Sequence, residues 1–127
     1  MEKSTVLLVS ADLVQVSSLG GRLKKAGYEV YTSSLGWETI ELLVETRPDL
    51  LILDWELPDL SSMAVIRAIR SRDSRIPIAL TGDQMDETDR VLALEAGADL
   101  CLTDTYQPQV AVARLGALLR RVERKQQ

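Results

Sequence analysis

The sequence predicts an α/β domain in which helices cover a parallel sheet. Five short runs rich in Val, Leu and Ile recur along the chain, and turn residues bound each of them. Stretches with apolar residues at helical spacing separate these runs. Strands that alternate with helices are typical of βαβ units, whose strands lie parallel in one sheet. The predicted strands are residues 5–9, 28–32, 50–53, 76–80 and 99–103.

A predicted helix follows each strand and carries apolar residues about three or four positions apart. This spacing places them on one helix face, where they can pack against the sheet. The positions are Leu13, Val16 and Leu23; Trp37, Ile40 and Val44; Val65, Ile66 and Ile69; Val91, Leu92 and Leu94; and Val110, Ala113, Leu115 and Leu118. Trp37 stands at the start of the second helix and is expected to be a packing residue.

Glycine and proline punctuate these elements where their backbone chemistry fits. Gly27 and Gly97 fall just past the first and fourth predicted helices, where a left-handed cap favours glycine. Pro48 and Pro77 stand beside the starts of the third and fourth strands, where a missing N–H is tolerated. Local turn chemistry therefore agrees with the hydrophobic pattern.

The composition excludes several classes of function. With 127 residues and a net charge of −4, the chain suits one domain and is a poor candidate for binding nucleic acid by itself. It contains no histidine, which excludes serine–histidine–aspartate triads and histidine-ligated zinc. Its single cysteine, Cys101, excludes an internal disulfide and a thiolate metal site. Because no signal peptide or apolar stretch of roughly 18 residues is present, we expect a cytoplasmic protein without a membrane partner.

Asp54 ends the apolar stretch LLILD, which reads as a fully buried strand. Because an unpaired buried carboxylate is costly, this side chain is expected at the exit of the strand. In an open parallel sheet, the ligand site lies beyond the carboxyl ends of the strands. The residues expected at this edge are Ser10, Ala11 and Asp12; Asp54, Trp55 and Glu56; Thr81, Gly82 and Asp83; and Thr103, Asp104 and Thr105.

Three motifs in the sequence carry a resemblance to a known family. They are LILDWELPD with Asp54 and Pro58, IALTGD with Thr81, and EAGAD at residues 95–99. In these motifs the sequence resembles a response-regulator receiver domain, from residue 4 to about 122. The resemblance implies a flavodoxin-like, doubly wound (βα)5 domain with a five-stranded parallel sheet in the order 2-1-3-4-5. It also implies that Asp54 is the phospho-acceptor, Thr81 the switch hydroxyl and a histidine kinase a partner.

The sequence departs from the receiver pattern at the residues that handle charge. Receivers normally end the first strand with two adjacent acids that hold Mg²⁺, and these positions are Ser10 and Ala11 here. The family's lysine falls at Asp104, and the switch aromatic falls at Tyr106. A cation has thus become an anion, and both partner ligands of Asp54 for the metal are missing.

These departures remove what phosphoryl transfer to a carboxylate needs, because that reaction brings two anions together. At about 4 Å and an effective dielectric near 20, each contact changed from attraction to repulsion costs several kcal/mol. We therefore expect a pseudo-receiver, in which Mg²⁺-dependent phosphorylation of Asp54 is lost or severely weakened. We expect this domain to have no cofactor and not to be an enzyme. The alternative is a conventional receiver that completes its metal site with Asp12 or a water.

The acidic residues leave a second alternative open, a divalent-cation site with reorganised ligands. Its weak candidates are Asp12, Asp54 and Glu56, with Asp83 and Asp104 nearby in the predicted edge. The favoured interpretation of Asp12 is instead a cap of the first helix, since a side chain there can accept from free backbone N–H groups.

The tail AVARLGALLRR is similar to the last helix of the OmpR/PhoB subfamily. The resemblance implies a homodimer through the fourth helix, the fifth strand and the fifth helix. Apolar residues replace two common acidic partners, so this dimer is expected to form without phosphorylation. The residues expected on this face are Arg90, Leu94, Asp99, Leu100, Val110, Arg114 and Arg121.

The resemblance also implies a division of the chain. We expect residues 1–122 to form the receiver domain and residues 123–127 to begin a linker to a C-terminal DNA-binding domain. Contact with DNA is then expected only through that output domain, as part of a transcription factor.

Overall fold

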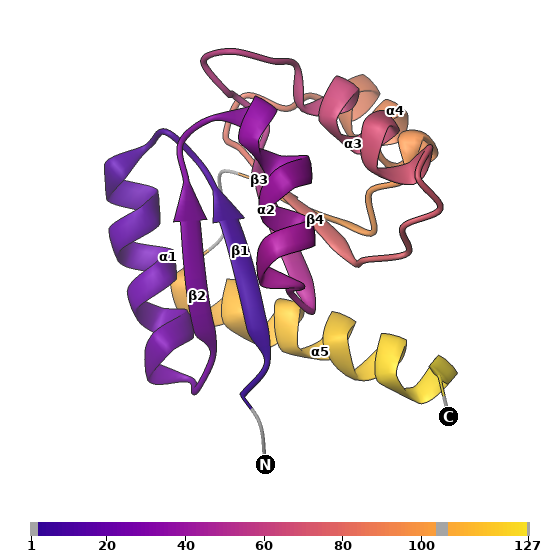
Figure 1. Cartoon of the computed structure of the whole chain (residues 1–127). Helices are drawn as coiled ribbons and strands as arrows, with labels where there is room; N and C mark the ends of the chain where they lie inside the picture. The colour runs from indigo at the N-terminus through magenta and orange to yellow at the C-terminus, as the bar shows by residue number, and fades with distance from the viewer. Residues whose placement is uncertain (1–2, 104–106, 127) are drawn as a thin grey trace.

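Five parallel strands form one sheet in the computed structural model, which describes residues 3–103 and 107–126 (Figure 1). The strand order is β2-β1-β3-β4-β5, so the predicted fold class and topology are confirmed. The strands are β1 (Thr5–Val9), β2 (Glu29–Ser33), β3 (Leu50–Asp54), β4 (Ile78–Thr81) and β5 (Leu100–Leu102).

Helices cover both faces of this sheet. They are α1 (Leu13–Lys25), α2 (Thr39–Thr46) with the short 3-10 helix η1 (Gly36–Glu38) before it, α3 (Ser62–Arg70), α4 (Glu87–Ala96) and α5 (Pro108–Gln126). One core lies between the sheet and helices α1 and α5, and the other lies beneath α2, α3 and α4. Side chains of β1 alternate between them, Val6 and Leu8 facing the first core and Leu7 and Val9 the second.

The predicted strand limits are within two residues of those observed. β4 begins at Ile78 rather than at residue 76. Pro77 has no N–H to donate, and the carbonyl of Ile76 accepts a hydrogen bond from Arg70 at 2.8 Å. A side chain therefore satisfies the backbone where a strand bond was expected.

Several apolar residues of the predicted helical stripes lie on the surface. Trp37 is 60% exposed, so the prediction that it packs is wrong. It belongs to the turn η1, whose Gly36 and Trp37 N–H groups donate to the Asp59 carboxylate. On α4 the only buried residue is Ala93, and Val91, Leu92 and Leu94 are exposed. The α4 stripe is therefore a surface feature.

Two of the predicted helix ends use the expected backbone conformations. Gly27 and Gly97 have φ of 100° and 128°, in the left-handed region that favours glycine. At Gly97 a Cβ atom would also lie 2.7 Å from Cγ of Arg70. This position therefore needs glycine for both its backbone angle and its clearance.

Arg70, at the end of α3, joins the α3–β4 and α4–β5 connections at the amino-terminal end of the sheet. Its Nε and Nη2 donate to the carbonyl of Gly97 at 3.1 and 2.7 Å, and its Nη1 donates to those of Ser74 and Ile76. Nη2 also forms a salt bridge with Asp99, at 3.1 Å. The same Asp99 oxygen accepts from Ile78 N at 2.8 Å, which fixes the entry to β4.

Helix α5 continues through the predicted domain boundary at residue 122 and includes residues 123–126. No helix within residues 3–103 and 107–126 is long and apolar enough to cross a lipid bilayer. The division into a domain and a linker stays a prediction.

Replacing Arg70 with Met should lower the free energy of unfolding by roughly 2–4 kcal/mol. The substitution keeps much of the apolar stem but removes the side-chain donor of three backbone carbonyls. It also removes the salt bridge of Asp99, whose Oδ2 keeps the Ile78 N–H. Urea denaturation measures the change, and Arg67→Met, at an exposed position on the same helix, is the control. Equal effects of the two substitutions would contradict the role given to Arg70.

Candidate functional site

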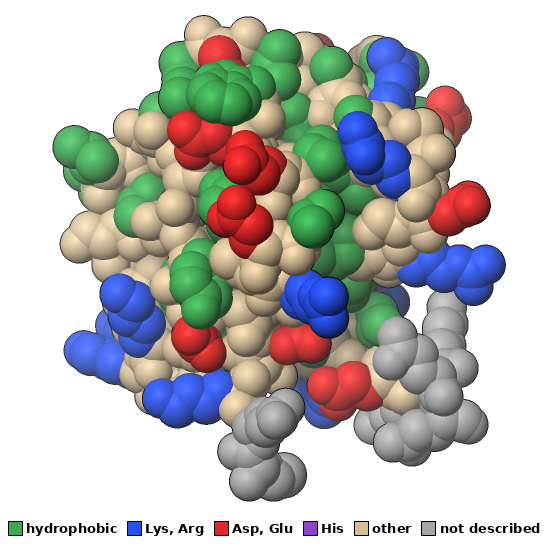
Figure 2. All heavy atoms as spheres, in the orientation of Figure 1, with side chains coloured by type: hydrophobic (Ala, Val, Ile, Leu, Met, Phe, Trp, Pro, Cys, Tyr) green, Lys and Arg blue, Asp and Glu red, His purple; other side chains and the backbone are tan. Residues whose placement is uncertain are grey.

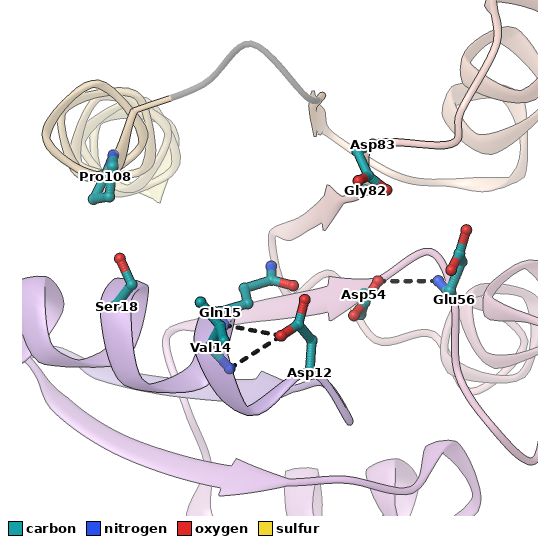
Figure 3. Close-up of a pocket in the computed structure, with 9 residues that line it drawn as sticks. All are labelled: Asp12, Val14, Gln15, Ser18, Asp54, Glu56, Gly82, Asp83 and Pro108. Atoms are coloured by element: carbon teal, nitrogen blue, oxygen red, sulfur yellow. Dashed lines mark hydrogen bonds between the residues drawn. The ribbon is translucent and has the colours of Figure 1, made fainter.

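A cavity of about 420 Å³ opens at the carboxyl ends of the central strands (Figure 3). The sequence predicted five of its lining residues: Asp12, Asp54, Glu56, Gly82 and Asp83. The remaining lining residues are Val14, Gln15, Ser18 and Pro108. The fold therefore gathers the predicted edge residues of β1, β3 and β4 around one hollow.

Asp54 is the last residue of β3 and is only 7% exposed. Its Oδ2 accepts from the Ser10 hydroxyl at 2.8 Å, and its Oδ1 accepts from the Glu56 backbone N–H at 3.0 Å. Burial raises the pKa of Asp54, and the nearby Asp12 and Asp83 charges act in the same direction, against these two hydrogen bonds. The carboxylate lies at the exit of the strand as predicted, but its surroundings disfavour its charged form.

Ser10 occupies the first of the two positions where a receiver carries acids. Its side chain is buried, and its hydroxyl both donates to Asp54 and accepts from the Asp12 backbone N–H at 3.1 Å. Ala11 is exposed and brings no polar side-chain atom. A neutral hydroxyl therefore meets Asp54 where a carboxylate would otherwise share a metal.

Thr81 ends β4 directly beside Asp54 in the strand register. Its side chain is fully buried, and its Oγ1 accepts a hydrogen bond from the side-chain amide of Gln15. Gln15 was not predicted as a site residue. Its position as the third residue of α1 was the only available signal, and glutamine there normally bonds back to the helix cap.

Asp12 caps α1, as one of its two interpretations predicted. Its Oδ1 accepts from the backbone N–H groups of Val14 at 3.0 Å and Gln15 at 3.3 Å. These bonds orient the first turn of α1, so that Gln15 extends toward the strand ends (Figure 3). One carboxylate oxygen of Asp12 is thus committed to the helix.

The side chains of the described residues do not fit the Mg²⁺ that the resemblance implies. Within residues 3–103 and 107–126, no three Asp, Glu, His or Cys side chains form a group that could hold a metal. Both oxygens of Asp54 already accept hydrogen bonds, and Ser10 is neutral. The suggested cation site at Asp12, Asp54 and Glu56 gains no support from this part of the chain. Asp104 and Tyr106 lie outside the described residues.

The residues of the predicted dimer face differ in their solvent exposure and in their contacts within the chain. Leu94 is 48% exposed and Val110 is 44% exposed. Arg114 and Arg121 are exposed as well, and Arg90 is half-buried. Asp99 is already paired with Arg70 within the chain, and Leu100 packs partly against the core beneath α5. Two of the seven predicted residues therefore have internal roles.

Several known proteins are similar to this chain. The transcriptional regulatory protein PrrA of Mycobacterium leprae (strain TN) is 39% identical over 116 residues, which are 91% of this chain and 50% of that protein. The alkaline phosphatase synthesis transcriptional regulatory protein PhoP of Bacillus subtilis (strain 168) is 36% identical over 118 residues, 93% of this chain and 49% of that protein. The chain thus spans about half the length of these curated relatives.

A solved structure and a family model agree with these relatives. The BeF3-activated N-terminal receiver domain of Klebsiella pneumoniae RstA has a TM-score of 0.86 and 28% identity, and the match covers 92% of this chain and 99% of that one. The family model for the response regulator receiver domain matches residues 6–115. This chain therefore belongs to the response regulator receiver domain family.

Proposed function

We propose that this receiver domain regulates a transcription factor through protein–protein contacts, largely without Mg²⁺-dependent phosphorylation of Asp54. The observation that carries the proposal is the hydrogen bond from Ser10 to Asp54 at 2.8 Å. It fills, with a neutral group, the position from which an acid would help to hold the metal.

The charges around the cavity support the same proposal. The side chains of Asp12, Asp54, Glu56 and Asp83 line it, and no lysine or arginine is among the described lining residues. A phosphoryl group that approached Asp54 would meet carboxylates with no cation to neutralise its oxygens. Phosphoryl transfer depends on such neutralisation, so the reaction here is slow or absent.

A conventional receiver, which accepts a phosphoryl group on Asp54 from a histidine kinase, is the alternative function. One observation favours it. Asp54 and Thr81 stay side by side in the β3–β4 register, with Asp54 lining an open cavity. In this alternative, Asp12 or a water completes the metal site.

We further propose that two copies associate through α4, β5 and α5 without a phosphate trigger. Leu94 and Val110 are large apolar side chains that remain about half exposed on this face. Burying them against a partner removes apolar surface from water, whereas exposed ion pairs contribute roughly 0–1 kcal/mol each. With Asp99 occupied by Arg70, apolar contacts and the arginines carry the proposed interface.

The names and lengths of the relatives support a place within a longer transcriptional regulator. They are transcriptional regulatory proteins of about twice the matched length. In our proposal, an output domain binds DNA, the receiver controls its pairing, and the whole protein works in the cytoplasm. A histidine kinase or another signalling protein is the proposed input partner.

Incubation with acetyl phosphate and millimolar Mg²⁺ should leave Asp54 unmodified in intact-mass spectra, because Ser10 and Ala11 supply no carboxylate and none of the described lining residues is a cation. Beryllofluoride with Mg²⁺ should likewise leave Trp55 fluorescence unchanged in a Trp37→Phe background. The double variant Ser10→Asp/Ala11→Asp is the matched control, in which Mg²⁺ should change Trp55 emission. A stoichiometric acyl phosphate on the parent chain would favour the conventional receiver.

Replacing Asp54 with Asn should raise the melting temperature at neutral pH. Because burial raises the pKa of Asp54, the folded state binds this proton more tightly than the unfolded state does. Stability therefore falls as pH rises through the interval above 3.8, the ordinary pKa, and the ionised group destabilises the fold beyond it. The advantage of Asn should shrink as pH is lowered through this interval. Thermal melts across pH test it, with Asp73→Asn at an exposed site as control; destabilisation by Asn at neutral pH would contradict it.

The proposed interface makes a different prediction for oligomeric state. The parent chain should sediment as a dimer, and Leu94→Asp or Val110→Glu should shift it to monomer, because each places a charge in the apolar contact. Val44→Glu is the control, because Val44 is an exposed valine on α2, outside the proposed interface. The face of the molecule shown in Figure 2, on which α2 lies, already carries acidic side chains. A monomer in every case would remove the interface.

A further inference from the structure

The side chain of Gln15 makes an unusual connection across the cavity. Gln15 is the third residue of α1, where glutamine normally completes a capping box by accepting from the cap residue's N–H. Here the Asp12 N–H donates to the Ser10 hydroxyl instead, at 3.1 Å. The Gln15 amide is thereby released from the cap, and it donates to Thr81, 66 positions away in the sequence.

The hydrogen bonds of Gln15, Ser10, Asp54 and Thr81 form one chain of contacts. Ser10 Oγ lies 2.8 Å from Asp54 Oδ2 and 3.4 Å from Gln15 Oε1. A hydroxyl has one proton, so Ser10 donates it to the nearer Asp54 carboxylate and not to Gln15 Oε1. Asp54 and Thr81 are neighbours in register, yet each of them is tied to the β1–α1 side of the cavity.

Thr81 depends on this amide. Its side chain is fully buried, and Gln15 is the partner of Oγ1 within the described part of the chain. A buried hydroxyl that loses its partner is costly, so removing the amide favours a new position for Thr81.

Short contacts connect Thr81 with the segment that leads into α4. The Thr81 carbonyl accepts from Trp55 N at 2.7 Å, and the next residue, Gly82, donates from its N–H to the Leu102 carbonyl at 3.1 Å. A Cβ atom on Gly82 would lie 2.8 Å from Cβ of Trp55, so the backbone is packed tightly on that side chain. The segment then leads into α4, whose Val91, Leu92 and Leu94 are exposed.

We propose that Gln15 is a positioning residue that holds Thr81, and with it the start of the β4–α4 connection, in one arrangement. The inference rests on the proposed function. Because the Gln15 amide donates to Thr81 Oγ1, it holds this side chain without using the proton of the Thr81 hydroxyl.

The test replaces Gln15 in the Trp37→Phe background. Gln15→Met keeps the length of the side chain and removes both polar atoms, whereas Gln15→Glu keeps an acceptor to which the Thr81 hydroxyl can donate. Ser18→Ala is the matched control, because Ser18 also lines the cavity from α1. Backbone amide hydrogen exchange, the Thr81 methyl shift and Trp55 emission are the readouts.

In Gln15→Met, exchange at Trp55 and Gly82 should rise about tenfold, as expected for a lost buried hydrogen bond, with a changed Thr81 methyl shift and Trp55 emission. Gln15→Glu should restore part of each signal, and Ser18→Ala should match the parent chain. Unchanged signals in Gln15→Met would overturn the inference. So would an equal rise in exchange at all core amides, since that indicates a general loss of stability.

The outcome is separable from that of the proposed function. Phosphorylation of Asp54 in the parent chain would overturn the proposed function, whatever the exchange data show. Unchanged exchange in Gln15→Met would overturn the positioning role of Gln15, even where Asp54 remains unmodified.

Discussion

The burial of one carboxylate at the end of a fully buried strand is the constraint on which the site depends. Asp54 ends β3, whose five residues are all buried, and no described lysine or arginine lines its cavity. A charge in that position needs donors, and the fold supplies two, the Ser10 hydroxyl and the Glu56 N–H. The turn from β1 into α1 is arranged around the first of these donors.

The cap of α1 and the site are consequently one structure. Asp12 holds the first turn of the helix, Ser10 holds the Asp12 N–H, and Gln15 is freed to reach Thr81. The ends of β1, β3 and β4 are thus joined by hydrogen bonds from the neutral side chains of Ser10 and Gln15. The substitutions at Ser10 and Ala11 are best understood together with Gln15.

The fold could be predicted because strand and helix periods, glycine caps and prolines all indicated the same arrangement. Asp54 and Thr81 could be placed because both end buried strands, and parallel strands present their ends at one edge. The role of Gln15 could not be predicted, because it arises only when the first turn of α1 lies against the end of β4 in the folded chain. The role of Arg70 and the surface position of the α4 stripe escaped prediction for the same reason. Helix α4 packs on the core through Ala93 and Ala96, and not through the stripe.

The Ser10–Asp54 hydrogen bond also has a consequence for how long a signalling state lasts. An acyl phosphate is removed by hydrolysis, so a phosphorylated receiver returns to its resting state at the rate of that reaction. A hydrogen bond between two side chains has no chemical lifetime of that kind. Under the proposed function, the fraction of paired chains follows the amount of protein by mass action, so synthesis and degradation set the output.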